Sequence, residues 1–154
     1  YPSLRFFEGT VISQGRGTYF PYPVLGATTL DGKYTFSFKP VSLPGMSETP
    51  LHQDSLCHGL DLRNYDTKIF HKTRQLNLRW LMELYQAYPQ KEKFFDKSQS
   101  RQIGNFDKLA GTVNLRKQII AGVSEQQIRN SWEPALSQFR KKRKKYLLYR
   151  DFTN

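Results

Sequence analysis

Alternation of apolar and polar side chains is clearest in residues 34–41, where every second residue from Tyr34 to Phe38 is aromatic. A period of two is typical of a strand that buries one face, so a half-buried strand is predicted here. A short apolar run predicts a further strand at residues 4–8, and a less regular alternation predicts another at residues 56–63. The segments between them are rich in glycine, proline and polar residues, which predicts two long loops. These loops are residues 10–30 and 42–55.

In the second half of the chain, apolar residues recur at steps of three and four, which predicts helices. The first helix would begin at a Thr73 cap and end before Pro89. A short helix over residues 115–121 would stop at Gly122. Residues 90–104, between these helices, are polar and are predicted to be irregular.

A capping box predicts the start of the last helix, because Ser124 and Gln127 have the spacing that lets each side chain bond to the other's backbone amide. Pro134 lies within the apolar stripe that follows, so either a kink or a restart of the helix is expected. Residues 146–149 predict a closing strand. The order of elements indicates an α+β fold, with a small mixed or antiparallel sheet and C-terminal helices packed on it.

Composition limits the class of protein. The 154 residues, of which 38% are hydrophobic, indicate one folded domain over residues 1–154. No run approaches eighteen apolar residues, so no transmembrane segment is predicted. The chain opens without an initiator Met or a signal peptide, and we expect it to be a piece of a longer protein. The single cysteine, Cys57, excludes an internal disulfide.

The formal net charge is +11, and the last fifteen residues carry +6 of it because of the run from Arg140 to Lys145. Such a run can bind phosphates, which makes a nucleic-acid-binding domain one hypothesis. Cations are also favoured at the solvated C-terminal end of a helix, where they complement the helix dipole. We favour the second interpretation and do not expect nucleic acid as a partner.

The most informative chemistry lies in residues 7–18, where one carboxylate is followed by a loop with three glycines. Glycine adopts positive φ readily and lets the backbone approach a ligand closely. An arginine between two glycines is therefore expected to be presented, and its planar guanidinium suits a carboxylate or phosphate. The alternative is a tight turn with a solvated arginine. The candidate binding residues are Glu8, Thr10, Ser13, Arg16 and Thr18.

Other kinds of site have little support. No Gly-Lys-Ser/Thr follows the loop, and Phe20 stands where the dinucleotide fingerprint requires glycine, so no cofactor is expected. His52, Asp54 and His58 are metal-ligand types, but their spacing matches no metal site and no metal is expected. Cys57 and His58 are neighbours on a predicted strand and would point to opposite faces, which argues against a catalytic pair.

Glycoside hydrolysis requires two carboxylates. Glu8 is the one candidate in the glycine-rich loop. Glu48 and Asp54 lie in the second loop and can approach it across the end of the sheet, although solvated loop carboxylates are the simpler interpretation. The sequence therefore leaves the catalytic residues unassigned.

Several motifs together resemble the C-terminal half of the NamZ family of exo-β-N-acetylmuramidases, formerly a domain of unknown function. The resemblance spans essentially the whole chain. The motifs are Phe7-Glu8-Gly9-Thr10-x-x-Ser13-x-Gly15-Arg16-Gly17-Thr18-x-x-Pro21-Tyr22, Phe38-x-Pro40-Val41, Pro44-Gly45-Met46-Ser47, Cys57-x-Gly59-x-Asp61-Leu62-Arg63, Ser131-Trp132-x-Pro134 and Arg143-x-x-Tyr146-Leu147-Leu148-Tyr149.

The resemblance implies a glycoside hydrolase that releases terminal N-acetylmuramic acid from the non-reducing end of peptidoglycan fragments, in an extracytoplasmic compartment. It also implies a Rossmann-like N-terminal half, absent here, which carries the catalytic glutamates and forms the active-site cleft together with the C-terminal half. Arg16 would then bind the lactyl carboxylate, while Glu8 would bind sugar hydroxyls or orient Arg16. A non-catalytic module that binds peptidoglycan or another partner is the alternative.

Overall fold

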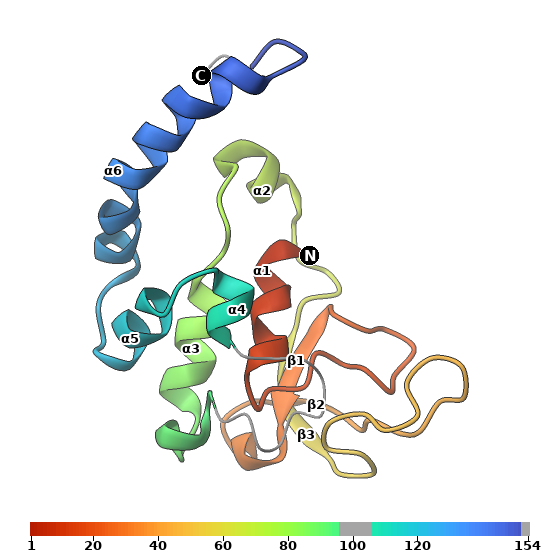
Figure 1. Ribbon diagram of the computed structural model, residues 1–154. Coiled ribbons are helices and arrows are strands. Elements are labelled where there is room, and N and C mark those ends of the chain that lie inside the picture. The colour runs from red at the N-terminus through yellow and green to blue at the C-terminus, as the bar shows by residue number, and fades with distance from the viewer. Residues whose placement is uncertain (96–105, 152–154) are drawn as a thin grey trace. The chain divides into compact units, whose positions relative to one another are not determined.

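A three-stranded antiparallel sheet and a series of helices make up the computed structural model, which describes residues 1–95 and 106–151 (Figure 1). The predicted α+β class is confirmed. The strands are β1 (Val24–Ala27), β2 (Phe36–Phe38) and β3 (Cys57–Asp61). The α-helices are α1 (Pro2–Arg5), α2 (Lys68–Thr73), α3 (Arg79–Ala87), α4 (Phe106–Ala110), α5 (Asn114–Ile120) and α6 (Glu125–Arg143). Short 3₁₀ helices are η1 (Phe6–Gly9), η2 (Thr28–Leu30), η3 (Lys91–Lys93) and η4 (Lys144–Tyr146).

The chain divides into two compact units, Tyr1–Arg116 and Lys117–Asn154. The first contains the sheet, and the second contains most of the last two helices. Within the described residues, no helix combines the length and the apolar composition needed to cross a membrane.

The sheet has the order β1-β3-β2, and its centre is built around glycine. Gly59 of β3 pairs with Gly26 on one side and with Phe36 on the other. A Cβ atom at Gly59 would lie 1.9 Å from the carbonyl oxygen of Leu25, so no larger residue fits without moving a strand. The predicted strands at 34–41 and 56–63 are confirmed in β2 and β3, although both are shorter than expected.

Two predictions near the N-terminus were wrong. Residues 4–8 form α1 and η1 instead of a strand, because Pro2 suits the first helical turn and the amides of Leu4 and Arg5 bond to the Tyr1 carbonyl. The predicted loop 10–30 contains β1, all four residues of which are buried. A strand covered on both faces has no alternating pattern, which explains why β1 was missed.

The helical predictions succeeded where end signals were specific. Helix α5 ends before Gly122, whose φ is 70°, and α6 begins at the predicted Ser124–Gln127 capping box. Thr73 was wrong as a start, since it ends α2 and its hydroxyl donates to the Ile69 carbonyl. Of residues 90–104, those from 96 onward lie outside the described residues.

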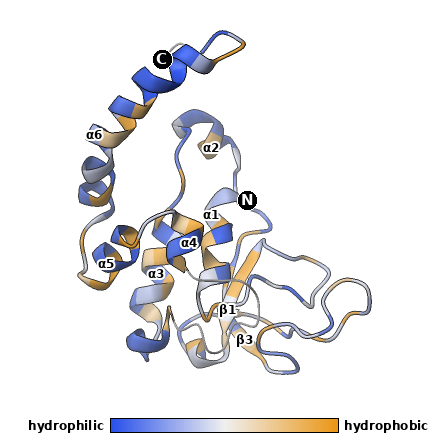
Figure 2. Cartoon of the chain, viewed as in Figure 1, coloured by the Kyte–Doolittle hydropathy of each residue, from blue (hydrophilic) through white to orange (hydrophobic). Residues whose placement is uncertain are grey.

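Helix α6 runs through Pro134 as one helix, so of the two predicted outcomes, a kink or a restart, the restart does not occur. Of the apolar residues along this helix, Ile128 is buried, but Leu136 and Phe139 are exposed. Hydrophilic residues dominate its C-terminal turns (Figure 2). The predicted strand 146–149 was also wrong: Tyr146 is the last residue of η4, and residues 147–149 belong to no strand of the described chain. The Leu148 side chain is 99% exposed.

Aromatic packing holds η1 against α4 in the first unit. The rings of Phe95 and Phe106 lie 4.8 Å apart, and Phe106 lies 5.8 Å from Phe6. Gly9 permits this contact, because a Cβ atom there would lie 2.5 Å from the Cα of Phe106. Glu8 directly precedes Gly9, so this close packing holds the backbone next to Glu8 in place.

Candidate functional site

The loop that follows η1 takes its shape from two glycines. Gly15 and Gly17 have φ values of 71° and 82°, a region that side chains disfavour, so the predicted conformational role of these glycines is confirmed. A Cβ atom at Gly17 would also lie 2.6 Å from the Val41 carbonyl oxygen. Arg16, between them, is therefore carried on a turn whose conformation depends on glycine on both sides.

Backbone hydrogen bonds attach this loop to the sheet. Ser13 and Gly26 exchange two bonds, of 2.8 and 3.0 Å, so that Ser13 extends the sheet beyond β1. Closer to the site, the amide of Tyr22 donates to the Gln14 carbonyl at 2.6 Å. The loop is thus closed at its base, and Arg16 and Tyr22 are held on the same closed segment.

Three of the predicted binding residues are buried, and their hydroxyls bond within the loop. Thr10 donates to the Phe7 carbonyl, and Thr18 donates to the Gly15 carbonyl at 2.6 Å. Ser13 accepts from the Gly15 amide. These bonds are those of local turns, in which a hydroxyl replaces a backbone partner. Contact of Thr10, Ser13 and Thr18 with a ligand stays a prediction.

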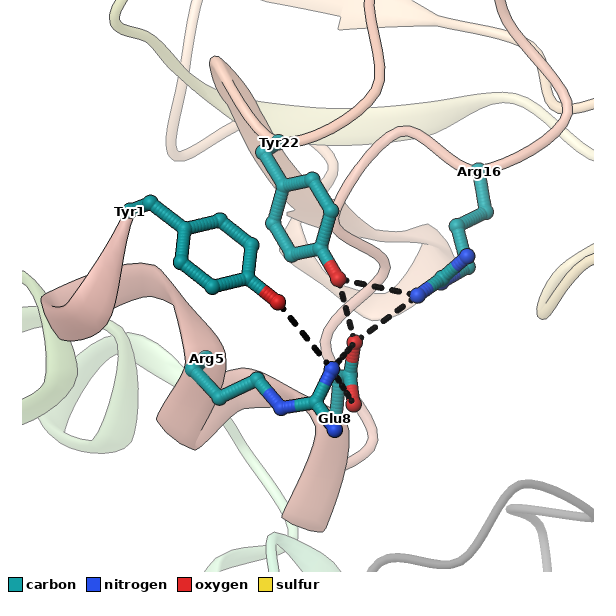
Figure 3. Close-up of polar contacts among 5 residues, drawn as sticks. All are labelled: Tyr1, Arg5, Glu8, Arg16 and Tyr22. Atoms are coloured by element: carbon teal, nitrogen blue, oxygen red, sulfur yellow. Dashed lines mark hydrogen bonds and ion pairs between the residues drawn. The ribbon is translucent and has the colours of Figure 1, made fainter. Parts of the chain in front are cut away.

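Glu8 and Arg16 lie together, as shown in Figure 3. Arg16 Nη2 is 2.8 Å from Glu8 Oε1 and donates a second bond, also of 2.8 Å, to the Tyr22 hydroxyl. The Tyr22 hydroxyl in turn donates to Glu8 Oε1 at 2.5 Å. Arg5 Nη1 lies between both carboxylate oxygens: it donates to Glu8 Oε1 at 3.0 Å and is 2.9 Å from Oε2. The same nitrogen donates to the Tyr1 hydroxyl at 3.2 Å.

Electrostatics keep this carboxylate ionised. Burial by itself would raise the pKa of Glu8, but the hydrogen bonds from Tyr22 and Arg16 and the charges of Arg5 and Arg16 outweigh it and lower that pKa. Burial and the bond to Glu8 raise the pKa of Tyr22 to about 12, so its phenol stays protonated and donates. The same contact with Glu8 raises the pKa of Arg16.

The cluster has one excess positive charge, because two guanidinium groups surround one carboxylate. Arg16 Nη2 donates its two hydrogens to Glu8 and Tyr22. Its Nε is buried without a hydrogen-bond partner among the described residues, and Nη1 has none in that part of the chain either. The Arg16 side chain is 31% exposed, so it can be reached from solvent. This arrangement suits one anionic group on a ligand.

Glu8 is poorly suited to act as a general acid, because that role needs a carboxyl whose pKa is raised. Glu48 and Asp54, the carboxylates expected to approach it, are both exposed, and Glu8's bonding partners within the described residues are Arg5, Arg16 and Tyr22. A pair of catalytic carboxylates is therefore not assembled in the described part of this chain.

Two other candidate side chains from the sequence, His52 and His58, have structural partners. His52 Nε2 contacts the Val11 carbonyl at 2.9 Å, and His58 Nε2 lies 3.3 Å from Asp31. Burial raises the pKa of Cys57 to about 12, which makes it a poor nucleophile. No cluster of three or more His, Cys, Asp or Glu residues suited to a metal ion occurs among residues 1–95 and 106–151.

Sequence reasoning missed three members of the cluster: Tyr1, Arg5 and Tyr22. Arg5 and Glu8 are three residues apart, which is a pairing distance only on a helix, and residues 4–8 were predicted as a strand. A correct helix prediction would therefore have found this ion pair. Tyr22 lies fourteen residues from Glu8, and only the closed loop brings them together.

Comparison with known proteins places this geometry in a family context. The family model described as the C-terminal domain of exo-beta-N-acetylmuramidase NamZ matches residues 1–149. A Bacillus subtilis protein named peptidoglycan beta-N-acetylmuramidase NamZ is 37% identical over 97% of this chain. The crystal structure of a DUF1343 family protein from Bacteroides fragilis is 36% identical over 99% of this chain, with a TM-score of 0.85. The chain spans 36% and 40% of the lengths of these two relatives.

Proposed function

The chain belongs to the family of NamZ C-terminal domains, which confirms the resemblance seen in the sequence, and from this premise we propose that it is the ligand-binding domain of a peptidoglycan exo-β-N-acetylmuramidase. The whole enzyme would remove terminal N-acetylmuramic acid from the non-reducing end of cell-wall fragments during cell wall turnover. Because that substrate lies outside the cytoplasm, we propose an extracytoplasmic location.

One observation carries the assignment of ligand binding to this domain: Arg16 is held by Glu8 while its Nη1 is left without a partner in the described chain. N-acetylmuramic acid differs from N-acetylglucosamine by a lactyl group, which ends in a carboxylate. The single excess positive charge of the cluster matches this single negative charge. A charged hydrogen bond of this kind contributes about 1.5–3 kcal/mol.

Catalysis is assigned to the remainder of the longer enzyme. Hydrolysis needs two carboxylates, one acting as acid and the other as base or nucleophile. Glu8 is held as an anion by Arg5 and Arg16, and its role in this proposal is to orient Arg16. The N-terminal part of the same protein is then the partner that completes the active site.

Replacement of Arg16 by alanine in the full-length enzyme tests the proposal. We expect kcat/KM for a chromogenic β-N-acetylmuramide to fall by about 10- to 100-fold, the equivalent of the lost bond. Affinity for N-acetylglucosamine, as a competing ligand, should stay unchanged. Arg140→Ala is the matched control, since Arg140 pairs with exposed Glu133 in the second unit. If Arg16→Ala weakened the binding of both sugars equally, the assignment would be contradicted.

A non-catalytic peptidoglycan-binding module is the second candidate, and it is favoured by the lack of a carboxylate pair among the described residues. The same assay separates the two functions. Turnover by the full-length protein, with binding but no turnover by residues 1–154, supports the enzyme domain. Binding without turnover by both supports the module.

A further inference from the structure

Tyr22 has an unusual backbone for a bulky residue. Its φ is 79°, in the left-handed region that favours glycine. The hydrogen bond from the Tyr22 amide to the Gln14 carbonyl holds this conformation, and Pro23 is the next residue. Such strained residues persist only where their surroundings hold them, and they cluster at functional sites. The conformation directs the Tyr22 side chain to the Glu8–Arg16 pair, as Figure 3 shows.

Both parts of the Tyr22 side chain make specific contacts. The ring meets Tyr1 edge-on, with the centroids 4.9 Å apart, and the Arg16 guanidinium lies 5.3 Å from the Tyr22 centroid. The hydroxyl bridges Arg16 Nη2 and Glu8 Oε1. The ring therefore packs the cluster, and the hydroxyl sets the position of Arg16 within it.

The hydroxyl also decides which edge of Arg16 a ligand can use. Nη2 carries two hydrogens, and Glu8 and Tyr22 accept one bond each from this nitrogen. Nε is buried. A carboxylate that approaches this arginine therefore meets Nη1, and the two-bond contact that a free guanidinium would offer is not available without rearrangement.

We propose that Tyr22 is a positioning residue for specificity: its hydroxyl holds Arg16 so that Nη1 is directed to the carboxylate of a muramic ligand. This inference rests on the proposed function. Without the hydroxyl, one Nη2 hydrogen loses its acceptor, and the guanidinium can rotate toward other partners. Recognition of the acidic sugar should then weaken, while a neutral sugar, which needs no such contact, should bind as before.

Tyr22→Phe tests this role because it removes the hydroxyl and keeps the ring. We expect KM for the chromogenic β-N-acetylmuramide to rise by about 3- to 10-fold in the full-length enzyme, in line with a lost neutral hydrogen bond. The inhibition constant of N-acetylglucosamine and the value of kcat should change by less than about twofold, because the bond serves recognition of the carboxylate alone.

Tyr34→Phe is the matched control. The Tyr34 hydroxyl also donates to a carboxylate, Glu83, at 3.3 Å, and its pKa is likewise raised to about 12. Tyr34→Phe should leave both the KM for the β-N-acetylmuramide and the inhibition constant of N-acetylglucosamine unchanged. The role of the hydroxyl would be overturned if Tyr22→Phe left KM unchanged, or if it weakened the binding of both sugars equally, while Arg16→Ala still weakened only the binding of the acidic sugar. Failure of Arg16→Ala to discriminate would overturn the proposed function and this inference together.

Discussion

At the scale of single residues, the cluster depends on one ionised carboxylate. Glu8 is 11% exposed and accepts bonds from three residues, and no other acid joins it among its partners in the described chain. A carboxylate in this position holds together cations that would otherwise repel each other. The stability of the first unit should therefore depend on the charge of Glu8 as well as on its shape.

The direction of the Glu8 pKa predicts how stability changes with pH. Its pKa in the folded protein is lowered from the ordinary value of 4.5, so the folded state favours the ionised form. The stabilisation is fully present above pH 4.5 and is lost as the pH falls through the lowered pKa. At pH 7, Glu8→Gln should reduce the free energy of unfolding by about 1–3 kcal/mol, the cost of the lost charged bonds. Urea unfolding at neutral and acid pH measures this.

A matched control separates this effect from surface electrostatics. Glu133 is 59% exposed and pairs with Arg140, so Glu133→Gln should change the free energy of unfolding by less than about 1 kcal/mol at any pH. The difference between wild type and Glu8→Gln should shrink toward acid pH. A difference that stays constant from pH 7 to pH 3 would show that the carboxylate contributes through packing rather than charge.

At the scale of elements, the sequence was informative where a signal depends on a few defined residues. The alternation of residues 34–41 identified β2, and the capping box of Ser124 and Gln127 identified the start of α6. Short apolar runs were not sufficient: residues 4–8 became helical and residues 146–149 stayed unpaired. Residues 4–8 follow Pro2, which suits the first turn of a helix, and residues 147–149 are assigned to no strand in the described chain, so an apolar run alone does not determine a strand.

The candidate site divides in the same way. The glycines on either side of Arg16 are a local signal, and they correctly identified a turn with positive φ. The partners of Arg16 come from two other places: Glu8 from η1 and Tyr22 from the end of the loop. Arg5 of α1 joins the cluster through Glu8. Only the closure of the loop and the packing of η1 bring these residues together. The sequence therefore predicted Arg16 and Glu8 but not Tyr1, Arg5 and Tyr22, which complete the network.

The capping box of α6 provides a prediction at this scale. Ser124 accepts a bond from the Gln127 amide, and the Gln127 side chain bonds to the Ser124 amide. Ser124→Ala should destabilise α6 by about 1 kcal/mol. Hydrogen exchange at the first-turn amides of α6 measures the loss. Ser137→Ala is the control: within the helix, alanine is the better helix former and should not increase exchange. Equal effects of both changes would contradict the role of the cap.

At the scale of the whole molecule, positive charge is distributed unevenly. The second unit, Lys117–Asn154, carries a formal +6, against +5 for the much longer first unit. Within the basic run, Arg140 pairs with Glu133 at 2.8 Å and Arg143 pairs with Asp151 at 3.0 Å. The four lysines of the run are exposed. These lysines are point charges without the planar geometry that arginine uses to recognise phosphates.

This distribution predicts how the protein interacts with nucleic acid. If four lysines each neutralise one phosphate of duplex DNA, affinity should fall with a logarithmic salt slope of about −3.6, which is roughly a 50-fold loss between 50 and 150 mM salt. Fluorescence anisotropy with a labelled duplex over this range measures the slope. A variant with Lys141, Lys142, Lys144 and Lys145 replaced by glutamine should lose the salt dependence. Tight binding that persists at 150 mM salt would instead make nucleic acid a genuine partner, since the lysines alone provide only a screened, sequence-independent attraction.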